Sequence, residues 1–408
     1  MKTRNSSISK IALRTIAVLL AAALALFILA DMRLAGKPIA RLVSGETSFK
    51  DFTTEVHDAL VSGTVGKYAF VNLNGLYCKL TGRSICNQVM LLSNGMLTNL
   101  NPEKEDMRPA ADAISALAAF SEDEGAQFLY VLSPAKMDAE NALLIPGESD
   151  HSNENGDELL SMLRAAGVDT LDLREALART PEQIEQYFFR TDHHWNFTGA
   201  FEAYRILTAQ LAERFPAANI DLSRADIANW EAHTLRSWML GSQGKRTGIY
   251  FGGTDDITYY TPRFAAESSC DIPAYSGGSA YYEGSFEDAN LRTDEYLRSR
   301  PDYFTSSPYD MYIGGEYALV RHRSDSAPSA LRVVIVKDSF VIPVQAFLST
   351  QFQYIDVLDP RYESAETVAE HIRAVQPDVV IVMLSAQSAG SYEEYADFGV
   401  DAPAEQCP

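Results

Sequence analysis

The sequence predicts an α/β fold in which helices lie on both sides of a parallel β-sheet. From about Arg108 onwards, segments with apolar residues at helical spacing alternate with short apolar segments. This order is typical of a parallel sheet whose strands are connected by helices. In the last third of the chain, the short segments are apolar at nearly every position, as expected of strands that are buried on both faces.

Two helix–strand units form the first half of the predicted sheet domain. In the first unit, Gly125 ends a helix and Phe128–Leu132 forms a short apolar strand. In the second unit, Gly167 ends a helix and Val168–Leu173 forms the strand. Glycine commonly follows the last turn of a helix because it adopts the left-handed backbone conformation without steric cost.

The C-terminal third has the strongest apolar pattern. Leu331–Val336 predicts a strand, Phe340–Thr350 a helix and Ile355–Leu358 a second strand. A further helix is ended by Pro377, and Val379–Leu384 contains no polar residue. These segments are expected to be buried parallel strands and the helices that connect them.

Residues 241–330 interrupt this alternation. They contain 11 of the 20 tyrosines among many glycines and serines, so we interpret them as an irregular, partly β insertion into the α/β domain. One interpretation of the tyrosines is a β layer that packs on the sheet. The other is an aromatic wall or lid for carbohydrate, because sugar rings stack on aromatic rings while their hydroxyls need polar partners.

The N-terminus predicts insertion into a membrane. Lys2, Arg4, Lys10 and Arg14 precede Thr15–Ala30, which is apolar after its first residue. A basic start followed by an apolar run is typical of an export signal. No small-x-small cleavage motif follows the run, which favours a retained anchor over a cleaved signal peptide. The rest of the chain is therefore expected outside the cytoplasm, at the cell membrane, or secreted if the signal is cleaved.

The chain is accordingly predicted to have four parts. Residues 1–10 form a cytoplasmic basic tail, residues 11–30 a transmembrane signal-anchor and residues 31–65 a tether. Residues 66–400 form the α/β domain, which includes the insertion 241–330.

The charge balance excludes one class of partner. The formal net charge is −21 at pH 7, and beyond residue 37 there are 28 basic residues against 54 acidic ones. A body this acidic repels phosphate backbones, so nucleic-acid binding is excluded. With 46% hydrophobic and 22% charged residues, the composition is that of a globular protein.

The four cysteines are too few for a disulfide scaffold and lack zinc-site spacing. Cys78 and Cys86 are separated by a short loop. A disulfide between them is expected if this part of the chain lies in an oxidising compartment.

The first candidate for chemistry is the pair Asp192 and His194. These residues are two apart, so on an extended segment their side chains project to the same side and His193 points away. A carboxylate beside an imidazole fixes the tautomer of the ring and stabilises its protonated form. The pattern predicts that His194 is a base oriented by Asp192.

The second candidate is Ser339, which follows the predicted strand Leu331–Val336 where a helix begins. A serine hydroxyl at this position can act as a nucleophile, and N–H groups at the helix start can stabilise an oxyanion. Together with His194 and Asp192, it predicts a Ser-His-Asp triad. The alternative is that Asp338 and Ser339 only cap the helix.

Two other interpretations of Asp192, His193 and His194 stay open. The first is a metal site, although adjacent histidines converge poorly on one ion and the other histidines lack ligand spacing. The second is a structural polar network. We expect neither a metal ion nor a cofactor.

Two segments resemble the DHHW protein family: Asp192-His193-His194-Trp195 and Lys337-Asp338-Ser339-Phe340. Members of this family are similar to alginate O-acetyltransferase proteins, which resemble SGNH hydrolases in fold. The resemblance covers roughly Gly66–Ser385, and further matching segments are Leu132–Lys136, Leu240–Ser242, Tyr312–Gly315, Asp356–Tyr362 and Pro377–Leu384. It implies that residues 66–400 are an SGNH-hydrolase-like catalytic domain.

The resemblance also implies an activity. It assigns Ser339, His194 and Asp192 to the triad of a serine O-acyltransferase, in the first place an O-acetyltransferase. The implied substrate is an exopolysaccharide or a cell-wall glycan, and the implied partner is a membrane-bound acyltransferase that hands over the acetyl group.

Three neighbours of the triad, Trp195, His193 and Lys337, are expected to bind substrate. Trp195 would wall the site or pack under it, and Lys337 would face solvent or reach an anionic substrate.

Two other functions remain possible from the sequence. The same triad could remove acetyl groups as an esterase, because transfer and hydrolysis differ only in whether a sugar hydroxyl or water attacks the acyl-enzyme. A protein without activity could instead bind glycan through the tyrosine-rich insertion, or act as a scaffold in polysaccharide export.

Overall fold

The structure is a computed structural model that describes residues 18, 32–64, 66–275, 277–298, 302–362, 364, 366–391 and 398–400. The chain divides into two compact units, Met1–Leu73 and Asn74–Pro408. The first unit contains η1 (Arg33–Ala35), α2 (Gly36–Ser44) and α3 (Phe49–Gly63), and α4 (Lys67–Leu80) begins in it.

None of the helices within the described ranges has both the length and the apolar character needed to cross a bilayer. Apart from Val18, the anchor predicted for residues 11–30 lies outside the described residues.

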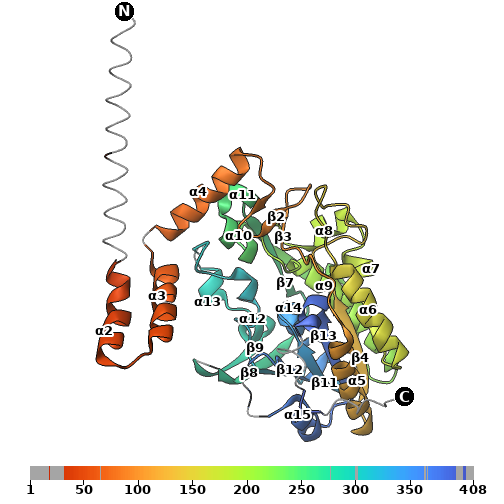
Figure 1. Cartoon of the computed structure of the whole chain (residues 1–408). Coiled ribbons are helices and arrows are strands. Elements are labelled where there is room, and N and C mark those ends of the chain that lie inside the picture. Colours follow the sequence, from red (N-terminus) through yellow and green to blue (C-terminus); the bar gives the residue numbers. More distant parts are fainter. Residues whose placement is uncertain are drawn as a thin grey trace, which may run out of the picture. The chain divides into compact units, whose positions relative to one another are not determined.

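The second unit is organised around an eight-stranded sheet (Figure 1). Across the sheet the strands are β5 (Thr170–Asp172), β4 (Gln127–Ser133), β13 (Val379–Ser385), β11 (Ser329–Lys337), β12 (Phe352–Leu358), β10 (Leu319–Arg323), β8 (Glu267–Tyr275) and β9 (Gly278–Ser285). The first five are parallel, which confirms the strands predicted from the apolar runs. The last three are antiparallel, so the sheet is mixed and the expectation of a wholly parallel sheet is wrong.

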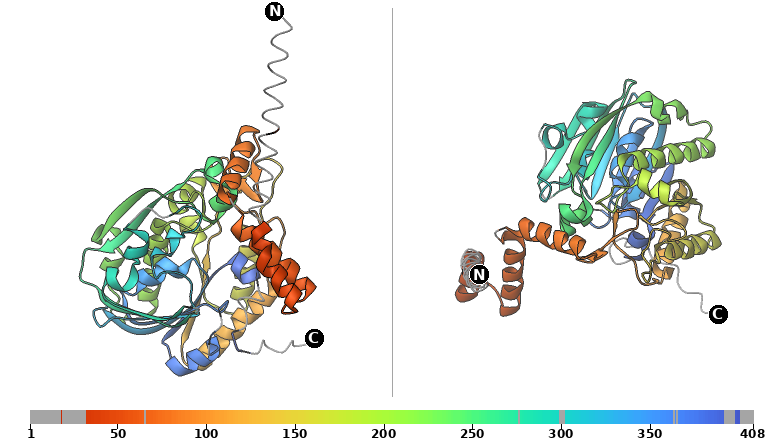
Figure 2. Two further views of the ribbon diagram at one scale, coloured as in Figure 1. Left: turned by 90° about the vertical axis from the view of Figure 1, so that its left-hand side faces the viewer. Right: turned by 90° about the horizontal axis from the view of Figure 1, so that it is seen from above.

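Helices cover both faces of this sheet (Figures 1 and 2). Alternate residues of β11 separate two cores: Val333 and Ile335 belong to one, Val334 and Val336 to the other. The first core is shared with α9 (Phe197–Arg214) and α14 (Val341–Leu348), and the second with α5 (Arg108–Asp123), α6 (Ser152–Ala165) and α15 (Val368–Val375). Burial on both faces explains why Val333–Val336 of β11 are all apolar.

The tyrosine-rich region extends the sheet instead of forming a separate body. It supplies β10, which pairs with the edge of β12, and then β8 and β9, which continue the sheet. Antiparallel neighbours need only short connections. Tyr260, Tyr309 and Tyr312 are buried in the first core, whereas Tyr250 and Tyr281 are exposed. The buried tyrosines of this region therefore belong to the core of the domain, in agreement with the first interpretation.

The second unit also contains elements outside the central sheet and the helices that cover it. Two small sheets contain β1 (Ile85–Cys86), β2 (Val89–Leu91) and β3 (Leu97–Thr98), and β6 (Trp230–Met239) with β7 (Asp255–Pro262). The remaining described helices are α7 (Arg174–Leu177), α8 (Pro181–Tyr187), α10 (Ser242–Thr247), α11 (Ile249–Gly252), α12 (Phe286–Asn290), α13 (Thr293–Tyr296), α16 (Ala386–Gly390), η2 (Leu222–Ala225), η3 (Ile227–Asn229) and η4 (Pro308–Met311).

The expected disulfide is not formed in this structure. Cys78 and Cys86 are free and buried, and the thiol of Cys86 contacts that of Cys78. Burial raises the pKa of Cys86 to about 12, so this thiol is protonated at neutral pH.

A buried charged cluster ties α15 to β12. Nε2 of His371 lies 2.9 Å from Asp356 Oδ2, and Nδ1 lies 2.6 Å from Glu366 Oε1. A ring that faces a carboxylate at each nitrogen must donate at both, which requires the imidazolium form. Burial acts to lower the pKa of His371, but the two carboxylates outweigh burial and raise it above its ordinary value.

The substitution His371→Gln is expected to lower the free energy of unfolding by about 1–3 kcal/mol at pH 6. The imidazolium contribution is complete below the unfolded-state pKa of about 6.5 and is lost as the pH rises through the raised folded-state value. Urea denaturation at pH 6 and pH 9 should therefore show a smaller difference between the two proteins at pH 9. His233→Gln, which removes a bond to Thr261, is the control. A His371→Gln difference that grows with pH would contradict the charged state.

Candidate active site

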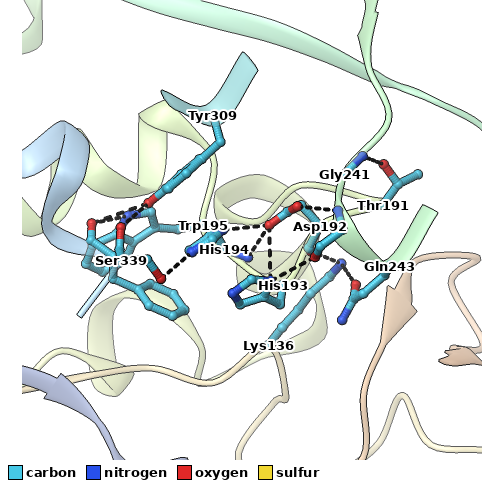
Figure 3. A network of polar contacts seen from close by, with 12 residues as sticks. Lys136, Thr191, Asp192, His193, His194, Trp195, Gly241, Gln243, Tyr309 and Ser339 are labelled. Carbon is cyan, nitrogen blue, oxygen red and sulfur yellow. Dashed lines mark hydrogen bonds and ion pairs between the residues drawn. The ribbon is translucent and has the colours of Figure 1, made fainter. Parts of the chain in front are cut away.

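The hydroxyl of Ser339, the imidazole of His194 and the carboxylate of Asp192 form one hydrogen-bonded row (Figure 3). Ser339 Oγ lies 2.6 Å from His194 Nε2, and Asp192 Oδ1 lies 2.6 Å from His194 Nδ1. A carboxylate only accepts, so Nδ1 carries the proton and Nε2 is left to accept the serine proton. The structure thus brings together the three residues predicted from sequence, and their catalytic role stays a prediction.

The local geometry of the histidine segment differs from the expected extended strand. Asp192 Oδ1 also accepts a hydrogen bond from the backbone N–H of His194 at 3.0 Å, which closes a turn. His193 does not point away: its ring centroid lies 3.7 Å from that of His194. The turn follows α8 and leads directly into α9, which Asn196 caps by accepting from the N–H groups of Thr198 and Gly199.

Asp192 is held as a carboxylate. Its Oδ2 accepts the N–H of Ser242 at 2.6 Å. Burial acts to raise the pKa of Asp192, but the His194 and His193 imidazoles and this N–H outweigh burial and hold it well below its usual range. Partial removal of the His193 ring from water, and then the neighbouring His194, lower the pKa of His193 to about 4, so its ring is neutral at pH 7.

A buried lysine stabilises the backbone of the turn at Asp192 through hydrogen bonds. Lys136 is 4% exposed, and its Nζ donates to the carbonyl oxygens of Asp192 at 2.8 Å and Arg190 at 3.1 Å. Burial lowers the pKa of Lys136 to about 7. The lysine follows β4, so a strand of the central sheet fixes the position of the turn.

The serine lies in the connection between β11 and α14, as predicted. The side chain of Asp338 stabilises this connection by accepting the N–H of Phe340 at 3.1 Å and the N–H of Ser385, the last residue of β13, at 2.9 Å. The N–H groups of Val341 and Ile342 donate to the carbonyl oxygens of Asp338 and Ser339. Within the described residues, the N–H of Ser339 itself has no such partner, so it is the backbone donor available to an oxyanion.

The three predicted substrate-binding residues have different positions. Trp195 is completely buried and its Nε1 donates to the carbonyl of Phe340 at 3.0 Å, so it packs under the site and does not wall it. Lys337 is 1% exposed, and its Nζ lies 2.7 Å from Asp359 Oδ2. The expectation that Lys337 faces solvent or substrate is therefore wrong, because its charge is neutralised inside the protein. The side chain of His193 is 43% exposed and its role stays a prediction.

Two hollows meet at Ser339, with volumes of about 360 and 410 Å³. Both are lined by His193, Ser242, Ser339 and Arg361. The first hollow is mainly polar and includes Asn99, Ser152, Arg246, Gln387 and Ser388. The second mixes apolar, aromatic and charged side chains, among them Leu240, Lys245, Asp310, Glu316 and Ile342. A ligand can thus reach the serine from two sides.

The metal interpretation of Asp192, His193 and His194 fits this geometry poorly. Possible ligand atoms of the three residues lie within 4.8 Å of one another. However, Asp192 Oδ1 and His194 Nδ1 are 2.6 Å apart, whereas two ligands of one tetrahedral ion are about 3.4 Å apart. The separation is that of a hydrogen bond, and the second nitrogen of His194 faces Ser339.

Comparison with known proteins agrees with this geometry. Residues 88–234 match the family described as the SGNH hydrolase-like domain of the acetyltransferase AlgX. This segment is similar to an SGNH hydrolase-like domain. It includes Asp192 and His194 and ends before Ser339. This match confirms the predicted resemblance. It also confirms the predicted class, which is an SGNH-like enzyme of the O-acetyltransferase type.

Solved structures with a similar fold cover more of this chain than the matched segment does. PatB1 of Bacillus cereus aligns with a TM-score of 0.60 and 20% identity, over 74% of this chain and 96% of PatB1. A DHHW family protein from Eubacterium siraeum DSM 15702 aligns with a TM-score of 0.53 and 18% identity, over 75% of this chain and 93% of that protein. At these identities the likeness concerns the fold. Comparison with curated protein sequences gives no match.

Sequence reasoning missed several residues that shape the site. Lys136 and the Gly241-Ser242 pair lie in segments quoted for the family resemblance, which was the available signal. Tyr309, which stacks on His194, is one of many tyrosines in its region, and nothing local marks it.

Gly241 leaves no room for a side chain beside Asp192. An added Cβ would lie 2.3 Å from the Cβ and 2.6 Å from the Cα of Asp192, although the backbone at φ −72° and ψ 178° suits any residue. We expect Gly241→Ala to lower the free energy of unfolding by about 1–3 kcal/mol and to slow the reaction of Ser339 with a sulfonyl fluoride.

Chemical denaturation and the rate of that reaction, followed by intact-protein mass, check this prediction. Gly36→Ala is the control, because an added Cβ there meets nothing within 4 Å and the backbone is already helical. Equal behaviour of the two variants would contradict the packing argument.

Proposed function

We propose that this protein is an extracytoplasmic serine O-acyltransferase that transfers an acetyl group to a hydroxyl of an exopolysaccharide or cell-wall glycan. The observation that carries the proposal is the hydrogen-bonded row Ser339–His194–Asp192, which opens onto two hollows. A nucleophile, a base and an orienting carboxylate in this order are the elements of acyl transfer through a covalent intermediate.

In the first half-reaction, Ser339 Oγ attacks the carbonyl carbon of the acyl donor while its proton passes to His194 Nε2. The Asp192 carboxylate holds Nδ1–H and stabilises the imidazolium that forms. The N–H of Ser339 faces the developing oxyanion as a donor. The bond to the leaving group then breaks, the leaving group takes the proton from His194, and an acetyl ester remains on Ser339.

In the second half-reaction, a glycan hydroxyl attacks this ester. His194 accepts the hydroxyl proton, the tetrahedral intermediate collapses, and the proton returns to Ser339 Oγ. The polar lining of the first hollow suits a polyhydroxylated acceptor, since serine, asparagine and glutamine side chains both donate and accept hydrogen bonds.

The comparisons support the activity without fixing the substrate. The matched family domain is that of an acetyltransferase. One structure of PatB1 carries a sulfonyl adduct, a modification that sulfonyl reagents form with nucleophilic groups. A membrane-bound protein that supplies the acetyl group, and attachment of the chain to the outer side of the cell membrane, belong to the same proposal.

Ser339→Ala should abolish the release of chromophore from a chromogenic acetyl ester, because no acyl-enzyme can form. Asp192→Asn should lower kcat by about 10³–10⁴, because the asparagine amide no longer selects the productive tautomer of His194. Ser349→Ala, at the other end of α14, is the matched control and should retain activity. Turnover by Ser339→Ala at the wild-type rate would refute the assignment.

Transfer and hydrolysis can be separated with the wild-type protein. Incubation with an acetyl donor and candidate oligosaccharides should give glycans heavier by one acetyl group in mass spectrometry, at a rate that depends on the glycan concentration. Acetate released with no acetylated glycan would favour an esterase. An unreactive Ser339 together with glycan binding would favour the non-catalytic alternative.

A further inference from the structure

Tyr309 stacks on the imidazole of His194. The two ring centroids are 3.9 Å apart and the ring planes differ by 8° (Figure 3). Tyr309 lies in η4, within the tyrosine-rich insertion, and is 2% exposed. The Tyr309 ring is therefore not only a packing residue of the core. A sugar ring cannot stack on the face that contacts His194.

The hydroxyl of Tyr309 contacts the backbone of Ser339. It donates to the carbonyl oxygen of Ser339 at 3.0 Å and lies 3.4 Å from that of Phe340. The Phe340 carbonyl also accepts from Nε1 of Trp195 at 3.0 Å. Burial, and then the nearby Asp192 carboxylate, raise the pKa of Tyr309 well above its ordinary value, so the hydroxyl remains a donor.

One side chain thus touches both the base and the backbone of the nucleophile, which lie 145 residues apart in the sequence. Phe197 packs on Tyr309 at 5.9 Å with an interplanar angle of 21°, and Phe189 meets it edge-on at 6.3 Å. These buried neighbours fix the tyrosine ring, so it can in turn fix the plane of the imidazole.

We propose that Tyr309 is a positioning residue, which holds the His194 ring in line with Ser339 and stabilises the imidazolium that forms in each half-reaction. The face of an aromatic ring attracts a cation, most strongly where water is excluded. The neutral imidazole is attracted less strongly to the Tyr309 ring than the imidazolium. The stacking therefore favours the state in which His194 carries the transferred proton. This inference rests on the proposed function.

The test compares Tyr309→Phe, Tyr309→Leu and Tyr309→pentafluorophenylalanine. Phenylalanine keeps the ring and loses the hydroxyl, so it should retain kcat within about fivefold. Leucine lacks the ring, and the fluorinated ring has a positive face, so each should lower kcat about tenfold below Tyr309→Phe with KM within about twofold. The rate of sulfonylation of Ser339 by phenylmethylsulfonyl fluoride should follow the same order.

Thermal melting establishes that the variants fold. Tyr312→pentafluorophenylalanine is the matched control, because Tyr312 is equally buried, meets Phe197 edge-on and bonds Tyr260 without a contact to His194. It should react like wild type. A Tyr309→pentafluorophenylalanine protein as active as Tyr309→Phe would overturn the inference, and so would an equal loss in the Tyr312 control.

The sulfonylation rate keeps the two proposals distinguishable. If wild-type Ser339 is sulfonylated but no acetyl group reaches a glycan, the proposed function fails while the order of the Tyr309 variants still decides this inference. If wild-type Ser339 does not react at all, both proposals are overturned.

Discussion

The site depends on the hydrogen bonds that the buried carboxylate of Asp192 accepts. Three donors converge on it: Nδ1–H of His194, the N–H of the same residue and the N–H of Ser242. An ionised carboxylate that is desolvated must be compensated in this way, because an unpaired buried charge is strongly destabilising. These three hydrogen bonds fix the turn at Asp192–His194 and the orientation of the His194 ring. They also hold Ser242, at the start of α10, beside Asp192.

A second set of buried charges supports the serine. The strand β11 ends with Lys337, which is paired with Asp359, and Arg361 bonds both Asp359 and Glu316. Burial acts to raise the pKa of Glu316, but Lys337 and Arg361 outweigh it and lower that pKa. Arg361 lines both hollows, so the network that stabilises the end of the sheet also contributes to the walls of the site.

The arrangement explains why the insertion is part of the catalytic unit. Three of its strands extend the sheet, and η4 places Tyr309 against His194. The residues that complete the site therefore come from the carboxyl ends of β4 and β11, from the turn before α9 and from the insertion. Parallel strands bring their carboxyl ends to one edge, and connections at this edge can gather side chains from distant parts of the sequence.

The sequence by itself determined the central strands, from Phe128–Leu132 to Val379–Leu384, because burial on both faces leaves an almost uninterrupted apolar pattern. It also singled out Asp192, His194 and Ser339, since a short spacing and a strand–helix junction are local features. The antiparallel extension of the sheet, the enclosed charge of Lys337, the position of Trp195 under the site and the stacking of Tyr309 were decided by tertiary structure. Each depends on contacts between residues far apart in the chain, and no local pattern records which side chain will meet which.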